Sequence, residues 1–377
     1  MATPSTPHKG LYNQPTQPDK YLFNSNNGGI LMSEMLSKSV IRRGFMERKC
    51  ILCSDEITLI NDTYEHILPN SIGGRKKVSG FICRSCNNET GEKWEFELSD
   101  QLSSLSLLFD IKRERGKPPS KIFRTSSGDK IQLNHDGTMD LPKPLFETVP
   151  HEKGVRYHVQ ARNLKEAQKI IDGIKNKHKG ANFEYELSAV EHKPKGPVEV
   201  SVHFGGLNVG RSIVKSALAV LFNNGIDPNT CSDALSFLKD DKGSNPCFGY
   251  YYASDPIKNR PRGLPLHCVY VKGDTTTKLI IAFVEFFGFQ RMALCLCQNY
   301  QGPDFEHYYA VNPLIGEELN LAFDFNMTSK DIQDCYDYKL IPHGVRECAF
   351  NEVMATAIRL DHERERLRNT QSSYNNV

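Results

Sequence analysis

Two pairs of cysteines lie near the start of the chain, Cys50 with Cys53 and Cys83 with Cys86. In each pair the two intervening residues allow a tight turn that presents both sulfurs to one metal ion. The 29 residues between the pairs can bring the two turns together. Four thiolates at such spacing favour a tetrahedral zinc site. Because four thiolates leave no open position for a substrate, we expect this zinc ion to be structural.

A second group of reactive side chains lies between and just after the cysteine pairs. Glu65 and His66 adjoin each other in the sequence Glu-His-Ile-Leu-Pro, and Asn87 and Asn88 directly follow the last cysteine. An imidazole can take a proton from water near neutral pH. Carboxylate and carboxamide oxygens are hard ligands that suit Mg²⁺ or Mn²⁺. An activated water beside a divalent cation is what hydrolysis of a phosphodiester requires.

The motifs Glu-His-Ile-x-Pro, Gly-Gly and Cys-x-x-Cys-Asn over residues 50–91 resemble those of the HNH, or ββα-metal, endonucleases with a zinc knuckle. The resemblance implies hydrolysis of DNA, with His66 as the general base that activates water. It also implies that Glu65 and Asn87 hold the catalytic Mg²⁺ or Mn²⁺, with Asn88 as the less favoured ligand. By the same resemblance, the chain looks like bacterial standalone HNH proteins associated with restriction or phage defence.

The segment from residue 75 to 82 departs from the family pattern and begins with a basic loop. It lacks the asparagine that in the family braces the loop bearing the histidine, although Ser79 could take that place. Basic side chains beside the site could contact phosphates that flank a scissile bond. These side chains are Arg75, Lys76, Lys77 and Arg84. A solvated loop without any nucleic-acid contact explains the loop lysines equally well.

The composition is that of an ordinary water-soluble protein. The formal net charge is +2, with 24% charged and 39% hydrophobic residues, so nucleic-acid binding must depend on local patches. The first residues lack the apolar core of a secretory signal, and the longest apolar run, 279–289, is too short for a membrane span. The other seven of the 11 cysteines show no paired spacing, which favours a reducing compartment. We therefore expect a cytoplasmic protein without membrane contact.

The pattern of apolar residues predicts an α+β protein in three parts. Residues 1–45 are expected to be a flexible tail with a lead-in helix over Ile30–Phe45. Residues 46–116 are expected to be a zinc-braced ββα nuclease module. Residues 117–377 are expected to form a larger mixed α+β domain for recognition or regulation. The implied partner is DNA, and cutting of both strands by a single active site would call for a homodimer.

Regular patterns within these parts predict individual elements. A helix after the last cysteine is expected to bury one apolar face, made of Trp94, Leu98, Leu102, Leu105 and Leu108. Further helices are expected at 164–174, where Asn163 is the cap, and at 208–223, 232–239 and 347–368. Strands are expected at 155–161, 183–187, 198–204, 268–271, 279–287, 292–297 and 308–311.

Two other functions fit the same residues. The zinc-braced turns could present a nucleic-acid-binding surface without catalysis, as the missing asparagine at 75–82 would allow. Alternatively, the module could be a nuclease that stays silent until the larger domain binds a small-molecule signal or a partner protein. Metal-dependent nicking of DNA by the isolated protein separates these interpretations.

Overall fold

The computed structural model describes most of the chain from Arg48 onward. The described ranges are residues 48–152, 154–188, 194–200, 203–240, 242 and 246–374. The lead-in helix expected over Ile30–Phe45 lies outside these ranges. Residues Arg48–Val377 form one compact unit. Its mixture of helices and strands agrees with the expected α+β class.

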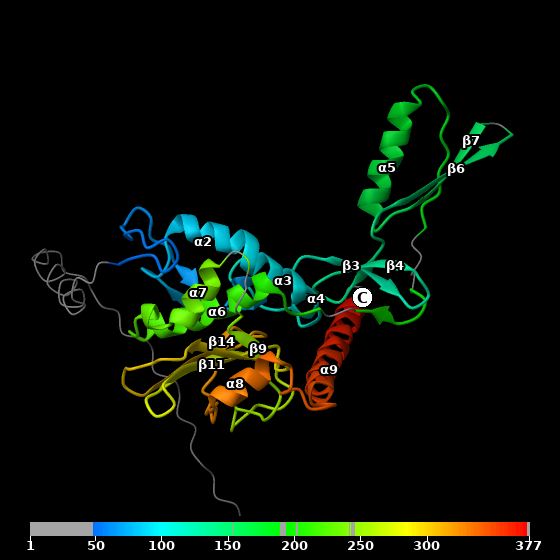
Figure 1. The fold of residues 1–377 in the computed structure, drawn as a ribbon. Coiled ribbons are helices and arrows are strands. Elements are labelled where there is room, and N and C mark those ends of the chain that lie inside the picture. Colours follow the sequence, from blue (N-terminus) through cyan, green and yellow to red (C-terminus); the bar gives the residue numbers. More distant parts are fainter. Residues whose placement is uncertain are drawn as a thin grey trace, which may run out of the picture. The chain divides into compact units, whose positions relative to one another are not determined.

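The largest sheet of the described residues is antiparallel and has six strands (Figure 1). The strand order is β14-β13-β10-β11-β12-β9. The strands are β9 (Phe248–Tyr250), β10 (His267–Asp274), β11 (Leu279–Phe286), β12 (Gln290–Cys297), β13 (Phe305–Asn312) and β14 (Glu317–Glu318). The central strands are rich in β-branched and aromatic residues, which pack well on a pleated surface. The strands predicted between residues 268 and 311 are therefore confirmed, with small changes at their ends.

Side chains of this sheet alternate between two buried faces. The consecutive residues Val269 and Tyr270 belong to different core clusters, as expected for a strand that is covered on both sides. Helices α6 (Leu207–Asn223) and α7 (Ser232–Lys239) cover the first face. Helix α8 (Ser329–Tyr336) covers the second face (Figure 1). The predicted helices at 208–223 and 232–239 are thus confirmed, and α6 is the most deeply buried helix near the candidate site.

The cysteine-rich module, which we define as residues 48–116, has short strands followed by a nearly continuous helical segment. Its elements are β1 (Glu65–His66), η1 (Asn70–Ile72), β2 (Lys77–Val78), α2 (Arg84–Thr90), the π-helical turn η2 (Gly91–Glu95), α3 (Phe96–Gln101) and α4 (Ser103–Leu108). The two strands pair antiparallel. Trp94, Leu98, Leu102 and Leu105 are buried and Leu108 is partly buried, which largely confirms the apolar helix face that their spacing predicts.

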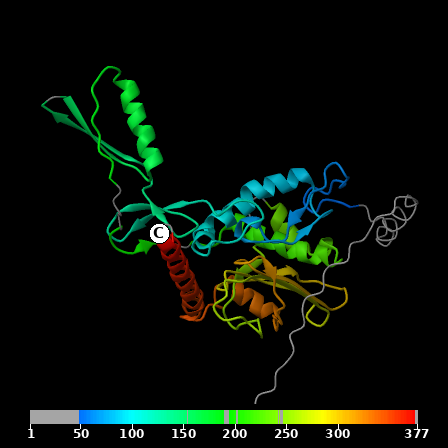
Figure 2. The same cartoon turned by 180° about the vertical axis from the view of Figure 1, so that it is seen from behind.

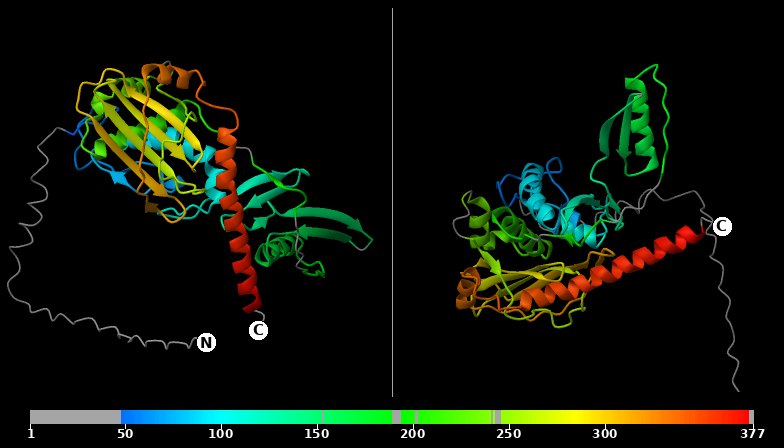
Figure 3. Two further views of the ribbon diagram at one scale, coloured as in Figure 1. Left: turned by 90° about the horizontal axis from the view of Figure 1, so that it is seen from below. Right: turned by 90° about the vertical axis from the view of Figure 1, so that its right-hand side faces the viewer.

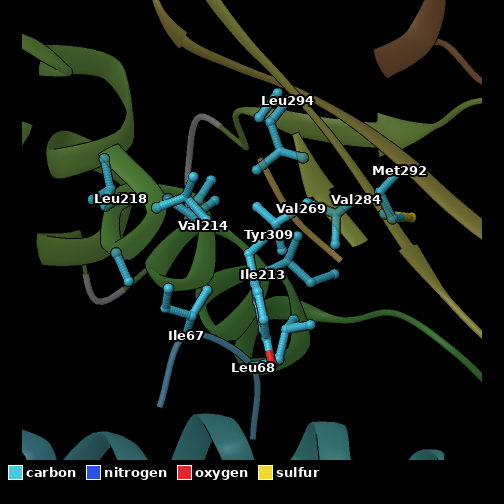
Figure 4. Close-up of a cluster of buried hydrophobic side chains, with 14 of the residues drawn as sticks. Ile67, Leu68, Ile213, Val214, Leu218, Val269, Val284, Met292, Leu294 and Tyr309 are labelled. Carbon is cyan, nitrogen blue, oxygen red and sulfur yellow. The ribbon is translucent and has the colours of Figure 1, made fainter. Parts of the chain in front are cut away.

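The cysteine-rich module and the six-stranded sheet share one hydrophobic core. Ile67 and Leu68, which follow β1, lie among side chains of α6 and of the sheet, as Figure 4 shows. The hydroxyl of Tyr309 on β13 accepts hydrogen bonds from the backbone amides of Arg75 and Lys76, at 3.0 and 3.2 Å. The module and the sheet therefore pack against each other. The predicted end of the nuclease module at residue 116 stays a proposal about function and not about separate folding.

The part of the sequence between the module and α6 forms two smaller sheets and a helix. One sheet has the order β5-β4-β3-β8, and β6 and β7 form a separate hairpin (Figure 2). Their strands are β3 (Lys121–Thr125), β4 (Lys130–Leu133), β5 (Met139–Asp140), β6 (Leu145–His151), β7 (Gly154–Gln160) and β8 (Val198–Glu199). Helix α5 (Leu164–Lys177) begins as predicted at Asn163, whose side chain accepts a hydrogen bond from the Glu166 amide at 2.9 Å.

The strand predicted at residues 183–187 is wrong. The alternation of Phe183, Tyr185 and Leu187 has the period of a strand, but the structure has no regular element there. Most side chains of this stretch are exposed, and no strand of the described sheets pairs with it. A strand is stable only where a partner strand and a buried face support it, so the alternation alone was insufficient.

The chain's last helix, α9 (Val345–Tyr374), includes the helix predicted at 347–368 (Figure 3). Its Arg364 donates a hydrogen bond from Nη2 to the backbone carbonyl of Leu108 at 2.7 Å, which ties the helix to the end of α4. Among the helices of the described ranges, none has the length and apolar character that a membrane crossing needs.

His267 links the six-stranded sheet to the cysteine-rich module. Its ring is fully buried, and Nε2 lies 2.8 Å from the backbone carbonyl of Ile72. Nδ1 accepts a hydrogen bond from the backbone amide of Phe287 at 3.0 Å. A neutral ring with its proton on Nε2 satisfies both contacts. Burial lowers the pKa of His267 to about 3, so the folded protein keeps this neutral form in mild acid.

We expect this histidine to make the folded state less stable in acid. Between its ordinary pKa of about 6.5 and the folded value of about 3, His267 binds a proton only in the unfolded chain. The free energy of unfolding therefore falls as pH decreases, by about 1.4 kcal/mol per pH unit from this group. His267→Gln, which keeps a donor toward Ile72, should remove that slope. Urea unfolding across mildly acidic pH measures it, and parallel curves for the two proteins would contradict the assignment.

Candidate functional site

The four cysteines of the two pairs meet at one point. The Sγ atoms of Cys50, Cys53, Cys83 and Cys86 all lie within 4.8 Å of one another. Cys53 Sγ and Cys83 Sγ are 3.7 Å apart. A tetrahedron with Zn–S bonds of about 2.3 Å has an edge of about 3.8 Å, so the donor set fits a zinc ion. Within the described part of the chain, this is the only cluster of three or more potential metal ligands of these residue types.

Local backbone geometry presents the sulfurs to this point. The first pair lies on a turn that closes through a hydrogen bond from the Ser54 amide to the Cys50 carbonyl, at 2.9 Å. The second pair begins α2, since the Asn87 amide donates to the Cys83 carbonyl at 2.9 Å. The metal would therefore join a turn before β1 to the start of the helix after β2, and so brace the strands between them.

The two glycines of the motif return the chain beside itself after His66. Gly73 has φ +97°, a left-handed conformation that an L side chain rarely adopts, and an added Cβ would meet Pro313 and Ile111. Gly74 packs against the backbone of Leu68, where an added Cβ would collide with the carbonyl. This close return sets the antiparallel pairing that places His66 opposite Lys77.

His66 ends β1 and contacts an acidic residue that lies beyond the motif. Its Nε2 lies 3.5 Å from Oε1 of Glu114, an ion-pair contact rather than a hydrogen bond. The Nζ of Lys77 lies 2.7 Å from the other carboxylate oxygen of Glu114. Burial, and then the charge of Lys77, lower the pKa of His66. The ring is therefore neutral at neutral pH and able to accept a proton.

Glu65 points into a buried group of charges. Its Oε1 lies 2.6 Å from Nζ of Lys215 on α6, and the same ammonium contacts Oε1 of Glu95 at the end of η2. Burial raises the pKa of Glu65 to about 8, while the charge of Lys215 opposes this rise and that of Glu95 adds to it. Two carboxylates share a single ammonium, so the group has an excess of negative charge when both are ionised.

Glu95 influences both Glu65 and His66. Consecutive strand residues point to opposite faces, yet the charge of Glu95 acts on the pKa of both Glu65 and His66. Burial opposes ionisation of Glu95, but the charge of Lys215 together with hydrogen bonds to Glu65 and Lys215 lowers the pKa of Glu95 below its ordinary value. Because β1 ends at His66, both members of the motif can serve a site around Glu95.

Asn87 is partly buried, whereas Asn88 is exposed. The Asn87 side chain donates from Nδ2 to Oγ1 of Thr63 at 3.2 Å, which leaves its Oδ1 as the atom for a cation. Thr63 lies two residues before Glu65 in the sequence. Asn87 and Glu65 do not hydrogen bond to each other in the described structure, so their joint role as ligands stays a prediction.

The four basic residues expected to contact phosphate have different surroundings. Arg75 donates to the backbone carbonyl of Lys112 at 2.6 Å, and Lys76 lies 3.5 Å from Glu318. Both therefore pack against other parts of the same chain. Lys77 lies beside the candidate site through its contact with Glu114, and Arg84 is exposed on α2. A role of these residues in nucleic-acid binding stays a prediction.

Three residues of the site were absent from the sequence-based prediction. Glu95 lies eight residues after Asn87, a spacing that returns to nearly the same helix face and could have indicated it. Glu114 and Lys215 carry no such signal, because they reach the site through tertiary contacts from elsewhere in the chain.

The donor set beside His66 fits a hard divalent cation. Glu65 and Glu95 offer carboxylate oxygens, and Asn87 offers an amide oxygen, which are the ligand types of Mg²⁺ and Mn²⁺. When Glu65 and Glu95 are both ionised, the excess negative charge around Lys215 is the structural feature that favours a cation here. This set has neither sulfur nor imidazole ligands, unlike the four-cysteine cluster, which suits zinc.

Comparison with known proteins identifies the segment that carries this site. Residues 50–103 match the family model described as HNH endonuclease. The match includes His66 and Glu95, and it ends before Glu114 and Lys215. No curated protein and no solved structure matches the chain. Residues 50–103 therefore resemble the HNH endonucleases, and this similarity covers only that part of the chain.

Proposed function

We propose that this protein is an endonuclease that hydrolyses DNA phosphodiester bonds with the help of a divalent cation. The observation that carries the proposal is the position of His66 within the matched segment. Its neutral ring lies at the end of β1, between the contact to Glu114 and the charge of Glu95. An uncharged imidazole beside carboxylates that can hold a cation is the combination that hydrolysis of a phosphodiester needs.

The side chains have separate tasks in this proposal. His66 takes a proton from the attacking water. Glu65, Glu95 and Asn87 would hold Mg²⁺ or Mn²⁺, which when bound supplies positive charge at the scissile phosphate and the leaving oxygen. The carboxylate of Glu114 lies 3.5 Å from Nε2 of His66, where its negative charge favours the tautomer with the proton on Nε2 and so leaves Nδ1 as the proton acceptor. The four cysteines would hold a structural zinc ion.

The test is nicking of a supercoiled plasmid by the purified, zinc-loaded, full-length protein. We expect open-circular or linear product with Mg²⁺ or Mn²⁺, and none when the divalent cation is withheld. The zinc-loaded His66→Ala variant, prepared in parallel, controls for contaminating nucleases. Binding of DNA by the wild type without cleavage, under every cation tested, would reject the proposal and support a zinc-braced binding module without catalysis.

Replacement of Glu114 by alanine is expected to slow cleavage about tenfold. The imidazole loses the group that fixes its orientation and tautomer, and an effect of about tenfold is typical of a partner one step removed from the reacting atoms. The loss of cleavage rate should be smaller than for a fully buried carboxylate that hydrogen bonds to a catalytic histidine. The Glu114 side chain is 30% exposed, and its Oε1 lies 3.5 Å from Nε2 of His66. The single-turnover rate of plasmid nicking measures it.

A double-mutant comparison separates this positioning role from a general loss of structure. In the His66→Ala background, Glu114→Ala should have no further effect on the residual rate. Glu317→Ala, which removes an exposed glutamate on β14, is the matched control. A loss of equal size in both backgrounds would count against the role of Glu114.

A nuclease that awaits a trigger is the second candidate, and one contact favours it. The Glu114 carboxylate lies between His66 and Lys77, where its negative charge would repel an approaching phosphate. In that case a signal would have to move Glu114 away before cleavage. Glu114→Ala distinguishes the candidates, because faster rather than slower cleavage indicates that this carboxylate blocks the site.

We further propose a setting in restriction or phage defence, which rests on the resemblance to bacterial standalone HNH proteins alone. Plaque formation on cells that express the wild type should fall below that on cells that express His66→Ala. Equal plaque numbers for the two proteins would reject this setting without affecting the proposed chemistry.

A further inference from the structure

Helix α6 carries a lysine into the HNH domain. Lys215 is 2% exposed and belongs to a helix whose other inward residues are mostly apolar, such as Ile213, Val214 and Leu218. An isolated ammonium in such surroundings is strongly unfavourable, because its lost hydration must be replaced by charged or hydrogen-bonding partners. The partners of Lys215 therefore explain how this side chain can be buried.

All partners of the ammonium belong to the HNH domain. Nζ lies 2.6 Å from Oε1 of Glu65, contacts Oε1 of Glu95, and donates to Oγ1 of Thr90 at 3.2 Å. These acceptors lie on β1, η2 and α2, so one ammonium with three hydrogens connects three elements of the site. Lys215 itself lies outside the segment that matches the family.

The other cation of α6 that faces the domain behaves differently. Arg211 lies one turn before Lys215, with its guanidinium 5.6 Å from the centroid of the Trp94 ring. It donates from Nη2 to the backbone carbonyl of Asp240, and no described ion pair joins it to a carboxylate. Arg211 thus packs against the domain, whereas Lys215 alone brings its charge to the two carboxylates.

We propose that Lys215 is a positioning residue of the nuclease site: it holds Glu65 and Glu95 side by side and limits how tightly the site binds a divalent cation. The inference rests on the proposed function, because it assigns these carboxylates to the cation. The ammonium offsets one of the two negative charges. With both carboxylates ionised, a divalent cation at this place therefore meets one net negative charge instead of two, and its binding is weaker.

The sign of the effect distinguishes this role from a purely structural one. Without the ammonium, a divalent cation is the strongest available neutraliser of two neighbouring carboxylates, so Lys215→Met should bind it more tightly. Even with the strong screening of bulk water, removal of one unit charge a few ångströms away amounts to about tenfold in affinity. A lysine that only stabilises the fold would give unchanged or weaker binding when it is replaced.

The experiment measures binding of Mn²⁺ to the full-length, zinc-loaded protein in the His66→Ala background, so that cleavage plays no part. Titration with detection of free Mn²⁺ by electron paramagnetic resonance gives the affinity. We expect Lys215→Met to bind at least about tenfold more tightly, and Lys215→Arg to resemble the parent because it keeps the charge. Glu95→Gln should bind more weakly than the parent.

Arg211→Met is the matched control, since it removes a cation from the same helix without touching a carboxylate, and it should leave the affinity unchanged. Zinc content and circular dichroism confirm that each variant is folded. Unchanged or weaker Mn²⁺ binding by a folded Lys215→Met overturns the inference, as does an equal gain in Arg211→Met. Plasmid nicking by the wild type tests the proposed function separately, so failure of one is distinguishable from failure of the other.

Discussion

Replacement of His66 by alanine should lower the rate of metal-dependent DNA cleavage by about 10²–10⁴-fold, the range for loss of a general acid or base. The wild-type ring is suited to this task because burial keeps its pKa below the ordinary histidine value. A neutral ring can accept a proton at neutral pH, and alanine leaves water as the only acceptor. The single-turnover rate of plasmid nicking, with saturating Mg²⁺, measures the loss.

Controls must show that the His66→Ala protein is intact. The variant should retain its zinc and its Mn²⁺ affinity, because the imidazole contacts neither the cysteines nor Glu65 in the described structure. His135→Ala removes a histidine of similar exposure that pairs with Asp110 instead, and it should cleave at nearly the wild-type rate. A zinc-loaded His66→Ala protein that still cleaves rapidly would remove His66 from the catalytic role.

The centre of the site could be predicted because its chemistry is concentrated in a short stretch of sequence. The two cysteine pairs, and the motif that contains Glu65 and His66, are local patterns whose spacing reflects turns and a single metal ion. The structure brings the four sulfurs together as that spacing predicts. It also ends β1 at His66, which is compatible with the predicted action of Glu65 and His66 on one site, although that action stays a prediction.

The completion of the site could not be predicted from such patterns. Lys215 is separated from Glu65 by 150 positions in the sequence, and Glu114 reaches His66 only after the chain has passed through five helical segments. Each is an ordinary charged residue in its own sequence context. A contact of this kind depends on how α6 packs on the domain, which periodicity does not encode. The segment 75–82 lacks the asparagine that in the family braces the loop with the histidine. Glu114, which contacts His66, lies outside that segment.

For the fold, too, local sequence patterns predicted single helices and strands, whereas contacts between distant segments were not predicted. Helices with a clear apolar stripe, such as α6, and strands with a buried face, such as β11, were predicted nearly to their ends. The shared core was not, because Ile67 and Leu68 look like part of a self-contained module until α6 is placed against them. The stretch 183–187 shows the opposite error, since its alternation has no partner strand.

Removal of the zinc ion should abolish cleavage and unfold part of the HNH domain. Cys50 and Cys83 are 1% and 4% exposed and belong to the shared hydrophobic core, so loss of the metal would leave buried thiols without their cross-link. Zinc binding to such sites amounts to about 10–16 kcal/mol in small peptides, comparable to the whole stability of a domain. Cys86→Ser should therefore lose zinc and show no cleavage, even with added Mg²⁺.

Hydrogen exchange can show where the structure is lost. Amides of residues 48–90 should lose protection in Cys86→Ser, because a metal ion held by the four cysteines would join the turn before β1 to the start of α2. Amides of β10 and β11 should keep theirs, since α6 and the second core cluster cover that sheet without the metal. Cys348→Ser changes an exposed cysteine outside the cluster and should match the wild type. If Cys86→Ser lost protection equally in the sheet and in the domain, the zinc ion would support the whole shared core, and the proposed local role of the metal would be wrong.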